Sequence, residues 1–244
     1  MNLLDELITR YPALSPCAGA IRSASDAIIA AYERGGKLLI CGNGGSAADA
    51  EHIVGELMKG YLSARRLPAD LAARLVATSP EIGPALASKL QGSLPAVNLA
   101  AGISLPTAFA NDVSAELSFA QAALGHGRKG DVLLGISTSG NAMNVRAALC
   151  VAKAVGITAI GLTGKGGGKM APLCDILVAV PATRTFEVQE LHLPVYHCIC
   201  AMVEERFFPA SDPEGHADHH YRAVPGDPEG RILSGDPKGR ISSS

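Results

Sequence analysis

The chain of 244 residues contains no tryptophan, and aromatic residues make up only 4% of it. Proteins that bind single-stranded nucleic acid stack bases on aromatic side chains, so this scarcity argues against such a function. The formal net charge is −2, so the chain also lacks the excess of positive charge that nucleic acids and acidic membrane surfaces attract. We therefore expect neither nucleic acid nor a membrane as a partner.

Long apolar runs and closely paired cysteines are absent as well. No apolar run reaches membrane-spanning length. The N-terminal stretch MNLLDELITRYPAL carries acidic residues early, which argues against a signal peptide. The cysteines are scattered without a C-x-x-C pair: Cys17, Cys41, Cys150, Cys174, Cys198 and Cys200. Buried free thiols in a reducing environment are the expected state, which predicts a cytoplasmic protein.

The chain does contain a strand, a glycine turn and a helix start in immediate succession. Residues 38–41 are apolar and of strand length, the turn GNGGS follows at 42–46, and alanines open a helix for which Ser46 is the expected N-cap. Unpaired N–H groups at a helix start, together with glycines that lack a Cβ atom, form an anion site. The run GNGGSA matches neither the dinucleotide fingerprint nor the P-loop. Phosphate is the predicted ligand, and a purely structural turn is the alternative.

His52 and Glu56 lie on one face of this helix because they are four residues apart. An imidazole and a carboxylate beyond a phosphate site can hold a metal ion or transfer protons. The same spacing is common on solvent-exposed helices, which is the alternative interpretation of this pair.

A second polar turn follows the apolar run at 131–136. It reads STSGN at 137–141 and precedes another helix. The hydroxyls of Ser137, Thr138 and Ser139 can surround an anion together with the N–H groups of that helix. An ordinary capped loop between a strand and a helix is the alternative.

Apolar runs of strand length alternate with helical segments along the chain. They lie at 38–41, 95–99, 131–136, 157–162 and 176–180. This alternation predicts an α/β fold with a doubly wound, five-stranded parallel sheet flanked by helices. Ligands of such sheets bind at the carboxyl ends of the strands, where both polar turns lie.

Two terminal segments lie outside this alternation. Helices expected at 2–34 precede the first strand and cannot cross between strands, so they should pack on a partner subunit or on the last helix. The segment 211–244 repeats DPEG, DPEG and DPKG with few apolar residues, which predicts an extended or disordered tail after a domain at 1–210. Three histidines of the tail are expected to be solvated rather than to bind a metal loosely: His216, His219 and His220.

The segment 63–94 is interpreted as an insertion between the first and second strands. Its prolines separate short helices expected near 68–76 and 80–90. Arg65 and Arg66 are either solvated surface charges or phosphate ligands, and surface charge is the expected role.

The last helix, expected at 186–207, carries Gln189 and His197 near one face, because eight residues are about two turns. Pro194 lies between them and is expected to loosen or kink the helix, whereas His192 falls on another face. A histidine on an apolar helix is usually a packed core residue, which is the alternative to a functional role for His197.

Three of these stretches read CGNGGSAADAEHIVGEL, LLGISTSGNAMNV and VQELHLPVYH, in that order. Together they resemble the sugar isomerase (SIS) domain of the phosphoheptose isomerase family, over most of residues 1–208. The resemblance implies a homotetramer with active sites between subunits. It also implies a phosphorylated seven-carbon sugar as the substrate. Such enzymes convert sedoheptulose 7-phosphate to D-glycero-D-manno-heptose 7-phosphate through an enediol, which feeds the synthesis of surface heptose.

The resemblance also implies roles for individual residues. Those implied to bind the sugar phosphate are Asn43, Gly44, Ser46, Ser137, Thr138 and Ser139, and those implied to line the rest of the site are Asn111, Asp112 and Gln189. Glu56 would be the base that moves carbon-bound protons, and His197 would be the second acid/base group. One Zn²⁺ per subunit would be bound by His52, Glu56, Gln189 and His197.

The chain departs from the family pattern at Ala142, where members often carry a serine, so one phosphate contact is expected to be weaker. Shorter members lack the insertion at 63–94, and the tail has no counterpart. A different phosphosugar is one alternative, and a non-catalytic regulator or a scaffold that binds a replication initiator is another. Non-catalytic members tend to lack the acid/base residues, so the presence of Glu56, Gln189 and His197 favours an enzyme.

Overall fold

Five parallel strands form a central sheet in the order β2-β1-β3-β4-β5. Their bounds are β1 (Leu38–Gly42), β2 (Ala96–Asn98), β3 (Val132–Ser137), β4 (Thr158–Thr163) and β5 (Ile176–Ala179). The computed structural model describes residues 2–209, so the predicted tail at 211–244 lies outside the described residues. The strand order grows outward in both directions from β1 and β3, which confirms the predicted doubly wound sheet.

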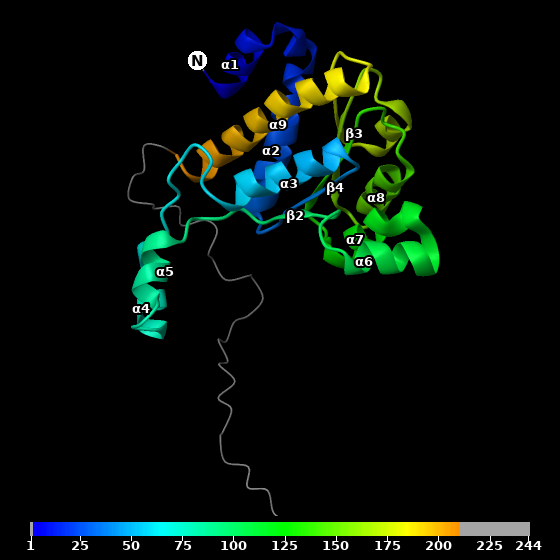
Figure 1. Cartoon of the computed structure of the whole chain (residues 1–244). Helices are drawn as coiled ribbons and strands as arrows, with labels where there is room; N and C mark the ends of the chain where they lie inside the picture. Colours follow the sequence, from blue (N-terminus) through cyan, green and yellow to red (C-terminus); the bar gives the residue numbers. More distant parts are fainter. Residues whose placement is uncertain (1, 210–244) are drawn as a thin grey trace, which may run out of the picture.

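Helices cover both faces of this sheet (Figure 1). In chain order the helical segments are α1 (Leu3–Arg10), η1 (Pro12–Cys17), α2 (Ala18–Glu33), α3 (Gly45–Met58), α4 (Ala69–Thr78), α5 (Gly83–Lys89), α6 (Ser104–Phe109), η2 (Ala110–Ser114), η3 (Ala115–Leu117), α7 (Ser118–His126), α8 (Met143–Ala154), η4 (Gly168–Leu173) and α9 (Thr185–Phe207). Within residues 2–209, none of them combines the length and the apolar character that crossing a membrane requires.

Alternate side chains of each strand enter two separate cores. Leu38 and Ile40 of β1 pack with buried residues of α2, α3 and α9 on one face. Leu39 and Cys41 pack with α7 and α8 on the other face. Because β1 and β3 are buried on both faces, their carboxyl ends are held rigidly where the two polar turns begin.

The N-terminal helices pack on α9, which was one of the two expected locations. The ring of Tyr32 meets the ring of Phe207 edge-on at 6.0 Å between centroids. Farther along the same contact, Arg206 Nη2 lies 2.5 Å from a carboxylate oxygen of Glu33. The N-terminal helices therefore hold α9 against the sheet.

Helices α3 and α9 run side by side in the same direction. A Cβ atom on Gly45, at the start of α3, would collide with the side-chain amide of Gln189, so that amide would have to move to admit one. About two turns farther on, His52 Nδ1 lies 3.0 Å from the hydroxyl of Tyr196. Both pairs are separated by 144 residues in the chain, so the two helices keep a constant alignment. A residue on the facing side of α3 therefore lies near the residue of α9 that comes 144 positions later in the chain.

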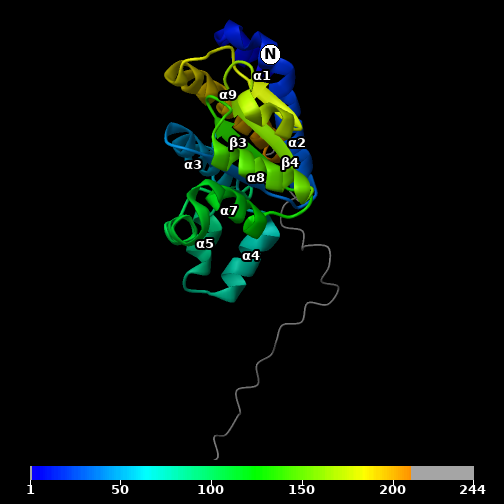
Figure 2. The ribbon, with the colours of Figure 1, turned by 90° about the vertical axis from the view of Figure 1, so that its right-hand side faces the viewer.

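The insertion forms a helical hairpin, α4 and α5, that projects from the rest of the molecule in both views (Figure 1, Figure 2). Helix α4 has no buried residue. Arg66 at its base is exposed, as expected, but Arg65 is only 3% exposed. The expectation that Arg65 is either a surface charge or a phosphate ligand is therefore wrong, because its guanidinium is paired with the buried carboxylate of Glu204.

All six cysteines are free thiols, as predicted. Four are buried and Cys174 is half-buried, whereas Cys150 is exposed on α8. The expectation of burial therefore fails at Cys150. Burial raises the pKa of the Cys41 thiol to about 12, so that thiol is unreactive at neutral pH.

Candidate active site

The β1–α3 turn bends sharply at Gly44, whose φ of +54° lies in the region that favours glycine. Gly44 is the N-cap residue and α3 begins at Gly45. The prediction that Ser46 caps this helix is therefore wrong, since the glycine conformation starts the helix one residue earlier. Ser46 instead lies in the first turn, is 4% exposed, and lines a cavity at the carboxyl edge of the sheet.

This cavity, of about 350 Å³, lies between the two polar turns. It is lined by Asn43, Gly44, Gly45, Ser46, Ile136, Ser137, Thr138, Ser139, Ala142, Thr185 and Gln189. The structure therefore brings together all six residues that were expected to bind phosphate. The starts of α3 and α8 flank the cavity, and both helix dipoles favour an anion there.

A pair of amides joins the two turns across this phosphate cavity. The side-chain amide of Asn43 donates to Asn144 Oδ1 at 2.9 Å, and Asn144 donates back to Asn43 Oδ1 at 2.8 Å. Sequence reasoning missed Asn144, which lies two residues after Ala142 in the STSGNAMN stretch. The reciprocal bonds fix the distance between the turns.

The acid/base cluster lies farther along α3. His52 Nε2 lies 3.1 Å from Glu56 Oε1, and His52 Nδ1 lies 3.0 Å from the hydroxyl of Tyr196. That hydroxyl also lies 3.4 Å from Asp49 Oδ1. Burial, and the negative charge of Asp49, raise the pKa of Tyr196, so the hydroxyl keeps its proton. When Tyr196 donates to Nδ1, His52 carries its proton on Nε2 and donates it to Glu56.

Sequence reasoning missed Tyr196 and Asp49. Both lie inside the quoted motifs, and Asp49 precedes His52 by three residues, on the same face of α3. That spacing was the available signal for Asp49. Tyr196 had none, because its contact with α3 depends on the alignment of two distant helices.

His197 completes the cluster from α9. Its ring centroid lies 5.0 Å from that of His52 and 5.8 Å from that of Tyr61. Burial and the neighbouring His52 lower the pKa of His197, so the ring is neutral at pH 7. Its Nε2 atom is buried and has no hydrogen-bond partner. A histidine of this kind is suited to exchange a proton with a ligand.

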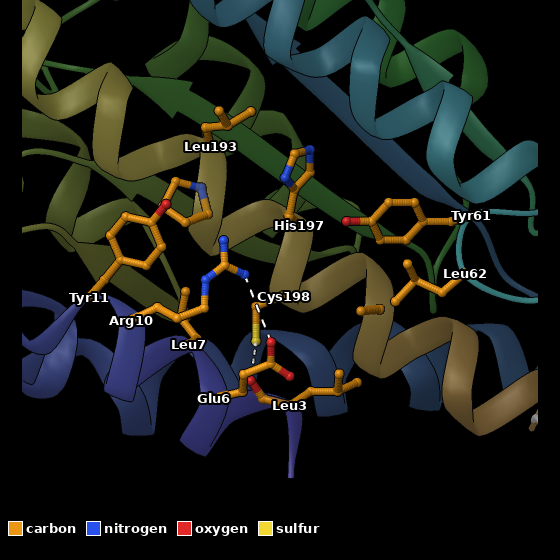
Figure 3. A pocket seen from close by; sticks show the side chains of 12 residues that line it. Leu3, Glu6, Leu7, Arg10, Tyr11, Tyr61, Leu62, Leu193, His197 and Cys198 are labelled. Carbon is orange, nitrogen blue, oxygen red and sulfur yellow. Dashed lines mark hydrogen bonds and ion pairs between the residues drawn. The ribbon is translucent and has the colours of Figure 1, made fainter. Parts of the chain in front are cut away.

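A second cavity, of about 360 Å³, opens beside His197 between α9 and α1. Figure 3 shows His197 between Leu193 and Tyr61, with Arg10 at the end of α1 and Tyr11 just after it on the opposite wall. His197 therefore borders a space distinct from the phosphate cavity, and α3 runs from the phosphate cavity to the acid/base cluster.

The remaining predicted residues lie apart from the cluster. Gln189 lines the phosphate cavity. Asn111 and Asp112 are exposed in η2 and bond to one another, with Nδ2 of Asn111 2.8 Å from Oδ1 of Asp112. Neither of the two lines either cavity. The described chain therefore does not bring Asn111 and Asp112 to the other site residues.

The donor atoms of His52, Glu56 and His197 fit a zinc ion in kind. Glu56 Oε2 and His197 Nε2 are buried and have no hydrogen-bond partner, and Lys59 Nζ lies 3.8 Å from Glu56 Oε2. Within residues 2–209, no three His, Cys, Asp or Glu side chains are already arranged to hold a metal ion. Binding would therefore require these side chains to turn toward a common point.

Comparisons with known proteins match most of the chain. Two family models, both described as a SIS domain, match residues 12–90 and 93–198. A phosphoheptose isomerase from Rhodospirillum rubrum is 40% identical over 192 residues, which cover 79% of this chain and 88% of that protein. Its counterpart from Burkholderia pseudomallei is 40% identical over 188 residues, which cover 77% of this chain and 82% of the relative.

The solved structure of a phosphoheptose isomerase from Neisseria gonorrhoeae superimposes with a TM-score of 0.64. It is 32% identical in sequence, and the match covers 82% of this chain and 94% of that one. Sequence and structure comparisons therefore agree on one set of relatives.

Proposed function

Because the chain belongs to the phosphoheptose isomerase family of SIS-domain proteins, we propose that it converts sedoheptulose 7-phosphate to D-glycero-D-manno-heptose 7-phosphate. One observation carries this proposal: His52 contacts both Glu56 and His197. His52 lies on α3, and the first turn of α3 lines the phosphate cavity. Helix α3 thus connects an anchor for the substrate with a group that transfers protons.

Glu56 is the base of this mechanism. Its Oε1 atom is bound by His52, whereas Oε2 has no hydrogen-bond partner and lies 3.8 Å from Lys59 Nζ, so Oε2 is the oxygen that accepts the proton. The carboxylate removes a proton from C1 of the ketose, and the electron pair of that C–H bond forms the C1–C2 double bond. The C2 oxygen takes up a proton at the same time, which gives the enediol. Return of the proton from Glu56 to C2 gives the aldose.

His197 transfers the oxygen-bound protons. Because its pKa is lowered, the ring is neutral, so it can accept the proton of the C1 hydroxyl and then pass that proton to the C2 oxygen, which returns the ring to its neutral form. The unpartnered Nε2 atom is the position for this exchange.

A zinc ion held by His52, Glu56 and His197, with Gln189 as the fourth ligand, is part of the proposal. When bound, zinc supplies a Lewis acid that polarises the C1 and C2 oxygens. Gln189 lies apart from the other three, in the wall of the phosphate cavity.

The proposed oligomer is a homotetramer in the cytoplasm. Exposed apolar side chains gather on the segment that carries Asn111 and Asp112: Ile103, Leu105, Val113 and Leu117. A subunit contact there would bury this surface and bring Asn111 and Asp112 to the site of a neighbouring chain. Light scattering of the purified protein tests this, and a monomeric mass would contradict it.

The decisive experiment incubates purified protein with sedoheptulose 7-phosphate and follows aldose formation, with and without a chelator. We expect conversion that a chelator abolishes and added zinc restores. Full activity after exhaustive chelation would remove zinc from the proposal. Binding of the sugar phosphate without turnover would instead favour the non-catalytic regulator, and turnover of only a shorter phosphoketose would reassign the substrate.

A further inference from the structure

A buried ion pair lies where α3 ends and passes close to α9. Arg65 Nε is 2.6 Å from Glu204 Oε1, and the two side chains are 0% and 2% exposed. The guanidinium also donates from Nη1 to the carbonyl of Leu57 at 2.5 Å and from Nη2 to the carbonyl of Glu56 at 2.8 Å. One side chain thus binds the last turn of α3 and the carboxylate of α9 together.

The carboxylate of Glu204 binds the loop that follows α3. It accepts hydrogen bonds from the backbone N–H groups of three consecutive residues, at 2.8, 2.6 and 3.2 Å: Tyr61, Leu62 and Ser63. The hydrogen bonds of this pair are buried or partly buried, so they are strong and hard to replace with water. The ion pair therefore fixes both the end of α3 and its loop to α9.

The backbone at Arg65 indicates how firmly this arrangement is held. Its φ of +38° lies in the left-handed region, which residues with a side chain rarely adopt, and it is the one non-glycine residue there within the described chain. Such a conformation persists only where the surroundings determine it, and here it is held by the three guanidinium bonds and by the Gly92 N–H, which donates to the Arg65 carbonyl.

Two of the groups held by this pair border the acid/base cluster. The carbonyl that Arg65 binds belongs to Glu56 itself, and the N–H that Glu204 binds belongs to Tyr61, whose ring faces His197. We propose that Arg65 and Glu204 are positioning residues for the isomerisation, which hold the Glu56 carboxylate and the Tyr61 ring in place relative to His197. This inference rests on the proposed function for its effect on catalysis.

The phosphate cavity gives this proposal a selective signature. Ser46 lies ten residues before Glu56 on α3, which corresponds to about 15 Å along the helix axis. Loosening the far end of α3 should therefore impair proton transfer and leave the phosphate anchor intact. A pair that served stability alone would lower the amount of folded protein and leave each folded molecule fully active.

The test compares Arg65→Met, Arg65→Lys and Arg66→Met in the full-length protein. Arg66 is the matched control because it is adjacent and exposed. For Arg65→Met we expect kcat per folded molecule to fall roughly 10- to 100-fold, with KM and inhibition by inorganic phosphate changed less than about threefold. Arg65→Lys keeps the charge but not the fork of donors, so it should recover part of the loss. If Arg65→Met is insoluble, the double variant with Arg65→Met and Glu204→Gln is measured in its place, because it removes both charges of the pair.

Hydrogen exchange measured by mass spectrometry supplies a readout that does not depend on the substrate. In Arg65→Met, amides of residues 54–64 should exchange at least about tenfold faster, while those of residues 43–50 keep their wild-type rates. Unchanged exchange at 54–64, or wild-type kcat per folded molecule, overturns the positioning role. If the wild-type protein fails to isomerise sedoheptulose 7-phosphate, the proposed function fails, and the exchange rates still decide whether the pair holds this end of α3.

Discussion

At the scale of single residues, Ala142 has no hydroxyl at a position where one could cap α8 or bind a phosphate. It is the N-cap residue of α8 and makes no side-chain capping bond. It also lines the phosphate cavity between the two polar turns. A hydroxyl at this position can cap the helix or donate to a bound phosphate, depending on whether the cavity is occupied.

We expect Ala142→Ser to raise stability and to tighten substrate binding. A serine cap contributes about 1 kcal/mol, which corresponds to roughly 2–4 °C in Tm for a domain of this size. One added hydrogen bond to phosphate should lower KM by about 3- to 10-fold. Thermal unfolding and steady-state kinetics measure the two effects. Ala142→Gly serves as the control, since glycine caps a helix without a hydroxyl, and an unchanged KM in the serine variant would show that this position does not contact phosphate.

Glu56→Gln removes the proposed base without changing the size of the side chain. The amide cannot accept the carbon-bound proton, so kcat should fall on the order of 10²- to 10⁴-fold. Calorimetry should show sugar-phosphate affinity within about threefold of wild type, because the phosphate cavity is untouched. Glu51→Gln is the matched control on the same helix, since Glu51 is exposed and bonds only to Asn98 within the described residues. Near-normal turnover in Glu56→Gln would falsify the mechanism.

At the scale of the elements, His192 lies where α9 packs on the end of β4. It is fully buried, and its neighbour there is the backbone of Thr163. Burial lowers the pKa of His192 to about 4 from its ordinary value of 6.5. The folded protein thus keeps this ring neutral under conditions where the unfolded chain binds a proton.

His192 makes the stability of the folded protein depend on pH. Above pH 6.5 neither state is protonated at His192, so the group has no effect on stability. Between pH 6.5 and about 4 only the unfolded state binds the proton, so stability falls as pH falls, by about 1.4 kcal/mol per pH unit. Urea unfolding at pH 7 and pH 5 should show that His192→Gln loses about 2 kcal/mol less than wild type over this interval. Equal losses in the two proteins would show that His192 is not the responsible group.

Local patterns predicted the elements well because each depends on neighbouring residues. The apolar runs of the five strands and the spacing of His52 and Glu56 are features of short segments. Arg65 was misjudged because its partner Glu204 is 139 residues away and comes close only once α9 has packed on α3. The bond between Asn43 and Asn144, 101 residues apart, has the same origin. What sequence reasoning missed is therefore mostly contact between distant elements.

At the scale of the whole molecule, the insertion is attached to the body at a narrow base. The backbones of Arg66 and Gln91 pair as an isolated antiparallel bridge, so both ends of the hairpin lie side by side. The N–H of Gly92 also donates to the carbonyl of Arg65 at 2.7 Å. Beyond this base, α4 buries no residue, so the hairpin adds little to the core.

Replacing residues 68–90 with a short glycine–serine turn should therefore preserve the fold. We expect Tm within about 4 °C of wild type and isomerase activity within about threefold, because only marginal apolar burial is lost. Circular dichroism and kinetics provide the measurement. A longer deletion, of residues 64–92, also removes Arg65 and should abolish activity. If the shorter deletion aggregates instead, the hairpin supports the body more than its exposure indicates.

Helix α3 also sets the distance between the phosphate cavity and the carboxylate of Glu56, and the substrate must span this distance. Ser46 and Glu56 both lie on α3, and ten residues at 1.5 Å each separate their backbones by about 15 Å along the helix axis. Helical side chains lean toward the N-terminus, so the carboxylate reaches back and shortens this gap. A sugar anchored by its phosphate must extend far enough to present C1 to that carboxylate, and one with fewer carbons would stop short. We therefore expect the pitch of α3 to contribute to the choice of substrate length.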